Sequence, residues 1–138
     1  MSPVDMWKIV EQRRRKERAG RRIYVSLNGR GEIAMNPEAF WQIDEPVNVT
    51  LLYDVKRRMI GVKVSVTADC DFFRVRRYGR GGRMRIVRAG RLLKQFGLTV
   101  ERTLVFTGIE FTEYKGAAMM LLSLDASAEV TPKLKLDR

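Results

Sequence analysis

The residues best suited to chemistry in this chain are the arginines of the segment 72–100, which contains nine basic side chains and no acidic one. In its first part the basic residues alternate with apolar ones. Phe73 and Val75 are predicted on one face of a strand, and Arg74, Arg76 and Tyr78 on the other. Same-face side chains of a strand lie roughly 6.6 Å apart. The pattern therefore predicts a ladder of positive charge.

Guanidinium groups held on a folded scaffold can contact phosphates through two parallel hydrogen bonds, whereas a flexible lysine tail offers only point charges. We therefore interpret the segment as a surface that binds nucleic acid. A solvated basic face without a ligand is the alternative interpretation, and the lack of interspersed acids argues against it.

The net charge of +11 is unevenly distributed along the chain. Segment 13–22 holds seven basic residues against Glu17 alone, so that this segment and 72–100 together carry +15 and the rest of the chain carries −4. A mildly acidic scaffold with two basic segments suits a polyanionic partner better than it suits general solubility.

Histidine is absent, and Cys70 is the only cysteine. This composition excludes Ser-His and Cys-His catalysis, histidine metal sites, zinc fingers and intramolecular disulfides. We expect no cofactor, no metal and no enzymatic activity. The chain has no apolar run near the length of a membrane span and no apolar signal-peptide core at its N-terminus, so we expect no membrane partner and a cytoplasmic location.

Alternating and helical patterns divide the chain into short elements. A basic N-terminal helix is predicted within 1–21, starting at Ser2 and Pro3. Strands are predicted over 22–28, 47–53 and 59–66. Asn36 and Pro37 are predicted to open a short helix, and Gly97 to end a second one. The side chains of these two helices that we expect in the core are those of Phe40, Trp41, Leu92, Leu93 and Phe96.

The order of these elements occurs twice. A strand, a glycine-arginine-glycine turn, a short extended piece, a short helix and a β-hairpin follow one another in 22–66 and again in 72–124, where the second hairpin is predicted from 103–113 and 117–124. The turns Asn28-Gly29-Arg30-Gly31 and Tyr78-Gly79-Arg80-Gly81 are identical at their last three positions. We interpret this as an approximate tandem duplication, followed by a loosely ordered tail at 125–138.

A unit with this order of elements resembles the AbrB-like swapped-hairpin DNA-binding fold of bacterial transition-state regulators and antitoxins, and two such units in one chain resemble the MraZ-like architecture. The resemblance covers about residues 22–124. It implies a mainly β protein with short helices (α+β), in which both units interlock in one pseudo-two-fold β barrel preceded by the N-terminal helix. It also implies that basic residues of the first strand, the turn and the following piece face DNA.

We expect the nucleic-acid contacts to come mainly from the second unit. The candidate site residues are Arg22, Tyr24, Arg30, Arg74, Arg76, Arg80, Arg83, Arg85 and Arg88.

The leading hypothesis is a non-enzymatic, DNA-binding transcriptional regulator, with a homo-oligomer as a candidate assembly. One alternative is an RNA-associated structural protein, with Tyr24, Phe72 and Tyr78 stacked on bases. Another is an antitoxin-like protein that binds a protein partner. An enzyme that uses carboxylates alone, such as Asp69 with Asp71 or Glu110 with Glu113, is the remaining alternative.

Overall fold

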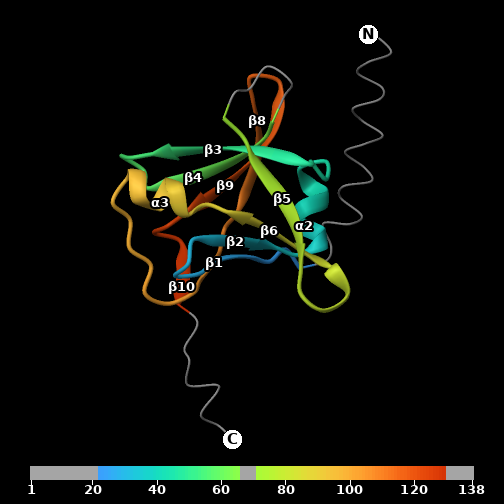
Figure 1. Ribbon diagram of the computed structural model, residues 1–138. Coiled ribbons are helices and arrows are strands. Elements are labelled where there is room, and N and C mark those ends of the chain that lie inside the picture. Colours follow the sequence, from blue (N-terminus) through green and yellow to red (C-terminus); the bar gives the residue numbers. More distant parts are fainter. Residues whose placement is uncertain (1–21, 66–70, 130–138) are drawn as a thin grey trace, which may run out of the picture.

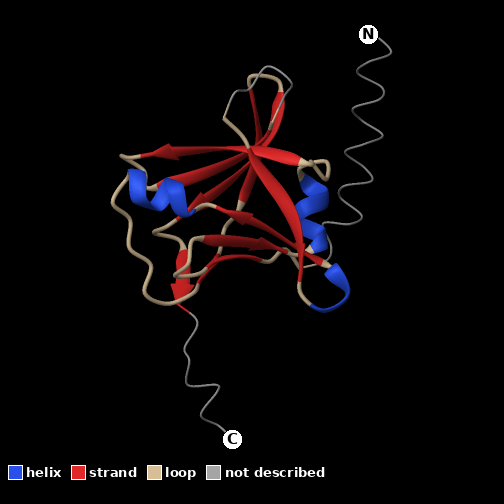
Figure 2. Cartoon of the chain, viewed as in Figure 1, coloured by secondary structure: helices blue, strands red, loops and turns tan. Residues whose placement is uncertain are grey.

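The structure is a computed structural model, and it describes residues 22–65 and 71–129 (Figure 1). The predicted N-terminal helix, Cys70, Asp69 and the end of the predicted tail lie outside these residues. Within them, strands predominate and the helices are short, as Figure 2 shows. The prediction of a mainly β fold with short helices is therefore confirmed.

The first half of the chain contributes four strands and one helix. These are β1 (Val25–Leu27), β2 (Glu32–Met35), α2 (Pro37–Gln42), β3 (Asn48–Asp54) and β4 (Met59–Val64). The second half contributes the remaining elements: β5 (Phe73–Tyr78), the 3-10 turn η1 (Arg80–Gly82), β6 (Met84–Arg88), α3 (Gly90–Gln95), β7 (Leu104–Phe106), β8 (Glu110–Tyr114), β9 (Ala117–Ser123) and β10 (Ser127–Glu129).

The strands form one antiparallel sheet in the order β10-β7-β1-β2-β6-β5-β3-β4-β9-β8. Hairpins from the two halves of the chain are neighbours in it. β2 of the first half pairs with β6 of the second, with Glu32 opposite Arg88 and Met35 opposite Arg85. β4 likewise pairs with β9. The two halves are thus connected through backbone hydrogen bonds as well as through side-chain packing.

The apolar face of the strands forms one core. Leu27, Ile33 and Val87 are fully buried there, together with Met120 and Leu122 from β9. The two helices lie on different sides of the strands in Figure 1, and each buries an apolar stripe against them. Burial of this kind stabilises a fold by about 25 cal/mol for each Å² of apolar surface removed from water.

Both helix boundaries follow the predicted signals. The side chain of Asn36 accepts a hydrogen bond from the backbone N–H of Ala39, and Pro37 occupies the first helical position of α2. At the end of α3, Gly97 has a φ of 64°, the N–H of Leu98 donates to the carbonyl of Leu93, and the N–H of Gly97 donates to that of Lys94. This is the hydrogen-bond pattern of a Schellman motif.

Two of the predicted core aromatic residues are not buried. Phe96 is 37% exposed, and its ring lies 4.8 Å from that of Tyr53, centroid to centroid. Trp41 is only half-buried. The prediction failed for Phe96 because α3 ends there, and the helical spacing that buries Leu92 and Leu93 no longer determines its direction. Phe40, Leu92 and Leu93 are buried as predicted.

The C-terminal strands also differ from the prediction. The strand expected over 103–113 is two strands, with Gly108 at a φ of 61° between them. β7 pairs with β1 and with β10, whereas β8 pairs with β9. Residues 127–129, which were predicted to belong to a loose tail, form β10. The edge of β7 offers backbone N–H and C=O groups for pairing, and a segment without apolar periodicity can bond to them.

The turn that joins β3 to β4 is stabilised by Asp54. The Asp54 carboxylate accepts hydrogen bonds from the backbone N–H of Arg57 and from its Nε at 2.9 Å, and these bonds hold the pKa of Asp54 below its usual value.

None of the helices in the described part of the chain has the length and apolar character to cross a membrane.

Candidate nucleic-acid interface

The four adjacent strands β1, β2, β6 and β5 turn one face to the core and the other outward. In antiparallel strands, directly opposed residues point to the same face. Ala34 lies opposite Ile86, which lies opposite Arg76, and Glu32 lies opposite Arg88. On β5, Arg74, Arg76 and Tyr78 are exposed while Phe73 and Val75 are half-buried. The predicted charge ladder on β5 is therefore confirmed.

The outward face is hollowed at one end by a concavity of about 460 Å³, which we call the arginine groove. Its walls come from the first turn, β2, the start of β5, the end of β6 and the start of α3. The residues that line it are Arg30, Glu32, Phe72, Phe73, Arg74, Arg76, Arg88, Gly90 and Arg91. Five arginines and one glutamate thus line the groove.

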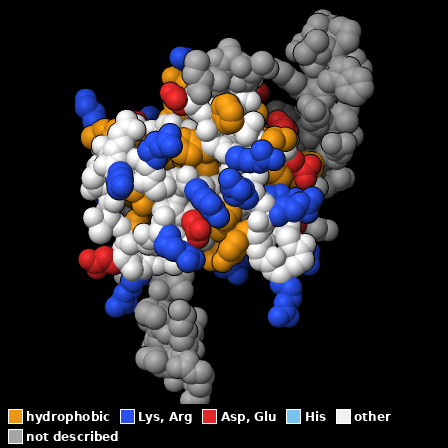
Figure 3. All heavy atoms as spheres, in the orientation of Figure 1, with side chains coloured by type: hydrophobic (Ala, Val, Ile, Leu, Met, Phe, Trp, Pro, Cys, Tyr) orange, Lys and Arg blue, Asp and Glu red, His pale blue; other side chains and the backbone are white. Residues whose placement is uncertain are grey.

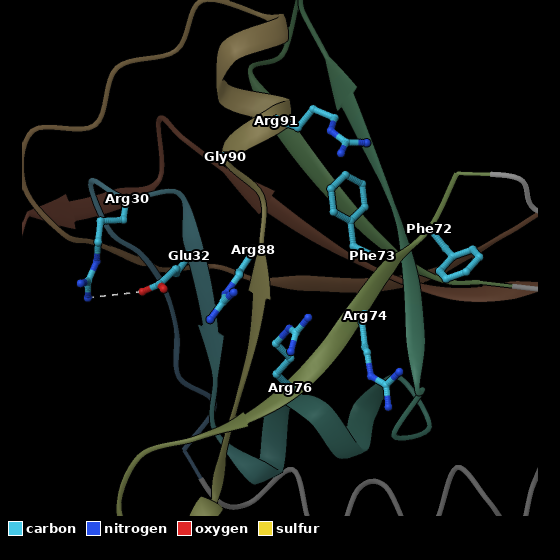
Figure 4. Close-up of a pocket in the computed structure, with 9 residues that line it drawn as sticks. All are labelled: Arg30, Glu32, Phe72, Phe73, Arg74, Arg76, Arg88, Gly90 and Arg91. Atoms are coloured by element: carbon cyan, nitrogen blue, oxygen red, sulfur yellow. Dashed lines mark ion pairs between the residues drawn. The ribbon is translucent and has the colours of Figure 1, made fainter.

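Figure 4 shows how these side chains lie. Arg76 and Arg88 extend from neighbouring strands into the same space, Arg74 lies along the outer side of β5, and Arg91 extends from α3 beside the ring of Phe73. Basic side chains also cross the middle of this face in the space-filling view of Figure 3.

The first turn positions Arg30 through its own side chains. Asn28 Oδ1 accepts hydrogen bonds from the N–H groups of Arg30 and Glu32, each at 3.0 Å, and Asn28 Nδ2 donates to Glu32 Oε1. The carboxylate of Glu32 in turn lies 3.5 Å from Arg30 Nη2. Glu32 therefore pairs with Arg30 at the groove and offsets part of the positive potential there.

The same turn packs against the start of α3. The N–H of Ala89 donates to the carbonyl of Gly31 at 2.6 Å. Gly31 has a φ of 85°, and a Cβ atom built on it would lie 2.7 Å from the Cα of Gly90. Only glycine fits such a contact. This close approach brings Arg30, from the first half of the chain, next to Arg88 and Arg91 of the second half.

The second turn lies at the opposite end of the four strands. β2 and β6 are antiparallel, so the turn before β2 and the turn before β6 point in opposite directions. Met84 and Arg88 mark the two ends of β6, roughly 13 Å apart at the usual strand rise. Arg80 and Arg83 are exposed at the far end and do not line the groove.

Arg85 was expected among the nucleic-acid contacts, and the structure places it on the inner face of β6, where it is half-buried. Its guanidinium carbon lies 5.1 Å from the centre of the Phe40 ring, and its Nη1 donates to the carbonyl of Gly82 at 2.8 Å. Residues of β6 alternate between faces, and Arg85 shares the face of the fully buried Val87. The guanidinium of Arg85 is therefore engaged by Phe40 and by the backbone of the second turn.

Arg22 and Tyr24 lie just before β1, near the end of the strands that carries the second turn. The carbonyl of Arg22 accepts a hydrogen bond from Asn36 Nδ2, and the backbone of Tyr24 bonds with both the backbone and the side chain of Asn36. Neither residue lines the arginine groove. The structure thus brings together Arg30, Arg74, Arg76 and Arg88 of the candidate residues.

The sequence interpretation missed Arg91 and Glu32 as groove residues. Arg91 belongs to the acid-free segment, and its position three residues after Arg88 was a usable signal. Glu32 gave no such signal, because its approach to Arg88 depends on the pairing of β2 with β6.

Of the two carboxylate pairs in the enzyme hypothesis, Asp69 with Asp71 lies partly outside the described residues, and only Glu110 with Glu113 lies wholly within them. Glu110 and Glu113 are both exposed, and their odd spacing places them on opposite faces of β8. Within residues 22–65 and 71–129, no three potential metal-ligating side chains gather into a site.

Comparisons of the chain with family models, with characterised proteins and with solved structures found no match. The resemblance to AbrB-like proteins therefore stays a prediction from the pattern of elements.

Proposed function

We propose that this is a non-enzymatic nucleic-acid-binding protein whose arginine groove holds the sugar–phosphate backbone. The observation that carries the proposal is the convergence of five guanidinium groups, from three strands or turns and a helix, on one concavity with a single carboxylate. Arginines held on regular elements are oriented before they bind, which favours bidentate contacts with phosphate oxygens.

The packing of the groove supports this function over a merely solvated basic face. A solvated face needs no fixed arrangement, but here Gly31 lies against Gly90, and Glu32 accepts a hydrogen bond from Asn28 Nδ2 while it pairs with Arg30. Like charges that are held together destabilise a fold unless a counter-charge is present or binds. A polyanion supplies that counter-charge.

We further propose that the two halves of the chain are a tandem duplication interlocked in a pseudo-two-fold β barrel. The hairpins β1–β2 and β5–β6 meet through β2 and β6, the hairpins β3–β4 and β8–β9 meet through β4 and β9, and a short helix follows the second strand of each half. When one half is expressed alone, its strands β2 and β4, or β6 and β9, lack the partner strands that the other half supplies. Residues 22–66 expressed separately should be unfolded or dimeric, and a stable monomer of this segment would contradict the interlocked arrangement.

DNA-dependent transcriptional regulation is the role that the AbrB-like resemblance implies, and it stays a prediction, as do a cytoplasmic location and homo-oligomer formation. The RNA alternative relied on three aromatic residues. Of these, Phe72 lines the arginine groove, whereas Tyr78 lies toward the second turn.

The test of the proposed function is the salt dependence of binding. If the groove neutralises phosphates, the logarithm of the affinity for a short duplex should fall linearly with the logarithm of salt concentration, with a slope of about −0.9 for each phosphate contacted. The measurement is fluorescence anisotropy of a labelled oligomer. The absence of binding to duplex and to single strands at low salt would refute the proposal. Nucleic acid that co-purifies, digested separately with DNase and RNase, would identify the natural class of ligand.

A further inference from the structure

A second concavity of about 710 Å³, which we call the aromatic groove, adjoins the arginine groove. It lies between the edge of β3, the start of β5 and the outer side of α3. Residues from all three carry its chemistry: Tyr53, Asp71, Phe72, Phe73, Arg91 and Phe96. Three of them, Phe72, Phe73 and Arg91, line both grooves. The two concavities thus share one wall.

The aromatic groove leaves large apolar rings in contact with water. Phe72 is 53% exposed and Phe96 is 37% exposed. The ring of Phe96 is tilted by 44° against that of Tyr53, so the two rings do not cover each other face to face. Exposed phenyl groups contribute little to folding, and exposed apolar surface beside a concavity is typical of a binding surface.

The charges of the two grooves differ. The arginine groove has five arginines and one glutamate, whereas among the described residues that line the aromatic groove only Arg91 and Asp71 are charged. The carboxylate of Asp71 disfavours a phosphate, and it can accept hydrogen bonds from the amino and imino groups of a base. A neutral, flat, apolar group is the ligand that the aromatic groove fits, next to an anionic group in the arginine groove.

We propose that the aromatic groove binds unpaired nucleobases, one stacked on Phe72 and another on Phe96, while the adjoining phosphates lie in the arginine groove. The ligand is then single-stranded nucleic acid, because bases inside a duplex are stacked on each other and expose no ring face. The combination of a basic groove for the backbone and aromatic side chains for the bases is how single strands are bound without sequence preference. This inference rests on the proposed function and specifies its ligand.

The test compares oligomers of equal length that differ in their bases, their sugar or their number of strands. A twelve-nucleotide thymidine oligomer, its uridine counterpart, an abasic oligomer with the same number of phosphates and a duplex of the same length are titrated with the full chain by fluorescence anisotropy. The wild-type protein should bind the base-bearing strands about tenfold more tightly than the abasic strand, as expected for base–aromatic stacking. The uridine arm separates RNA from DNA.

The matching variants are Phe72→Ala and Phe96→Ala, each of which should weaken binding of the base-bearing strands by roughly tenfold and leave binding of the abasic strand unchanged. Phe72 is the safer variant for folding because it is more than half exposed. The control is Tyr114→Ala, which removes a 40% exposed aromatic ring on β8 that lines neither groove. This variant should change neither the affinity for the base-bearing strands nor the affinity for the abasic strand.

The outcomes separate this inference from the proposed function. Equal affinity for base-bearing and abasic strands, with no effect of Phe72→Ala, would overturn the base site and leave phosphate binding in place. Tighter binding of the duplex than of any single strand would overturn it in the same way. If the protein bound none of the four oligomers, both the base site and the proposed function would be overturned.

Discussion

The two glycine-arginine-glycine turns share three residues in sequence and are held in different ways. The first turn is held by Asn28, whose side chain bonds to the N–H groups of the next residues, and it packs against α3. The second turn has Tyr78 in the place of Asn28, and η1 shows no side-chain cap. Its carbonyls are bound instead by Arg85, from the strand that follows.

This difference decides where an arginine can act. Arg30 is held by Glu32 and lies in a concavity with four other arginines. Arg80 is exposed at the other end of the strands, with no acidic side chain in the first turn of η1. A short motif therefore sets the local path of the chain, while its neighbours in space determine whether its arginine is part of a site.

The largest expected effect separates the two turns by stability. Gly31→Ala places a Cβ atom 2.7 Å from the Cα of Gly90 at a φ of 85°, whereas at Gly81, with a φ of 76°, the nearest atom is 3.8 Å away on a flexible arginine. Backbone strain costs about 1–2 kcal/mol at either site. Overpacking adds about 1–3 kcal/mol at Gly31 alone. Urea unfolding measures both, and equal losses would show that the first turn is not packed against α3.

The next effect separates the turns by binding. Arg76→Gln should weaken phosphate binding by about tenfold, as for a charged hydrogen bond, and should reduce the magnitude of the salt slope by about 0.9. The matched control Arg80→Gln removes the same charge from the exposed turn. It should cause a much smaller loss, because no other groove residue lies beside it. Equal losses in the two variants would mean that only net charge matters.

Much of the local structure could be predicted from the sequence, because it depends on neighbours in the chain. Alternation gave the exposed face of β5, Asn36 and Pro37 gave the start of α2, and Gly97 gave the end of α3. Each signal acts within a few residues, through strand geometry or a terminal hydrogen bond.

The site could be predicted only in part, because it depends on which strands pair. The antiparallel pairing of β2 with β6 brings Glu32 next to Arg88 and places Arg30 and Arg80 at opposite ends. Alternation within β6 alone did not indicate that Ile86 and Val87 would both be buried, with Arg85 on the core side. Likewise, nothing in 127–129 indicated a strand until the edge of β7 was known.

The smallest expected effect tests how the second turn is held. In Arg85→Gln the bonds to the carbonyls of Gly82, Arg83 and Met84 weaken, and the cation–π contact with Phe40 is lost. That contact and one net hydrogen bond are each worth about 0.5–1.5 kcal/mol, so the free energy of unfolding should fall by about 1–3 kcal/mol.

The matched control is Arg83→Gln, which removes an exposed arginine two residues away and should change the free energy of unfolding by less than about 0.5 kcal/mol. Because the guanidinium of Arg85 is engaged inside the protein, its replacement should leave the salt slope of binding unchanged, in contrast to Arg76→Gln. A reduced slope without loss of stability would show that Arg85 leaves the carbonyls and contacts phosphate. The second turn would then belong to the nucleic-acid interface after all, and the two turns would be equivalent in function despite their different supports.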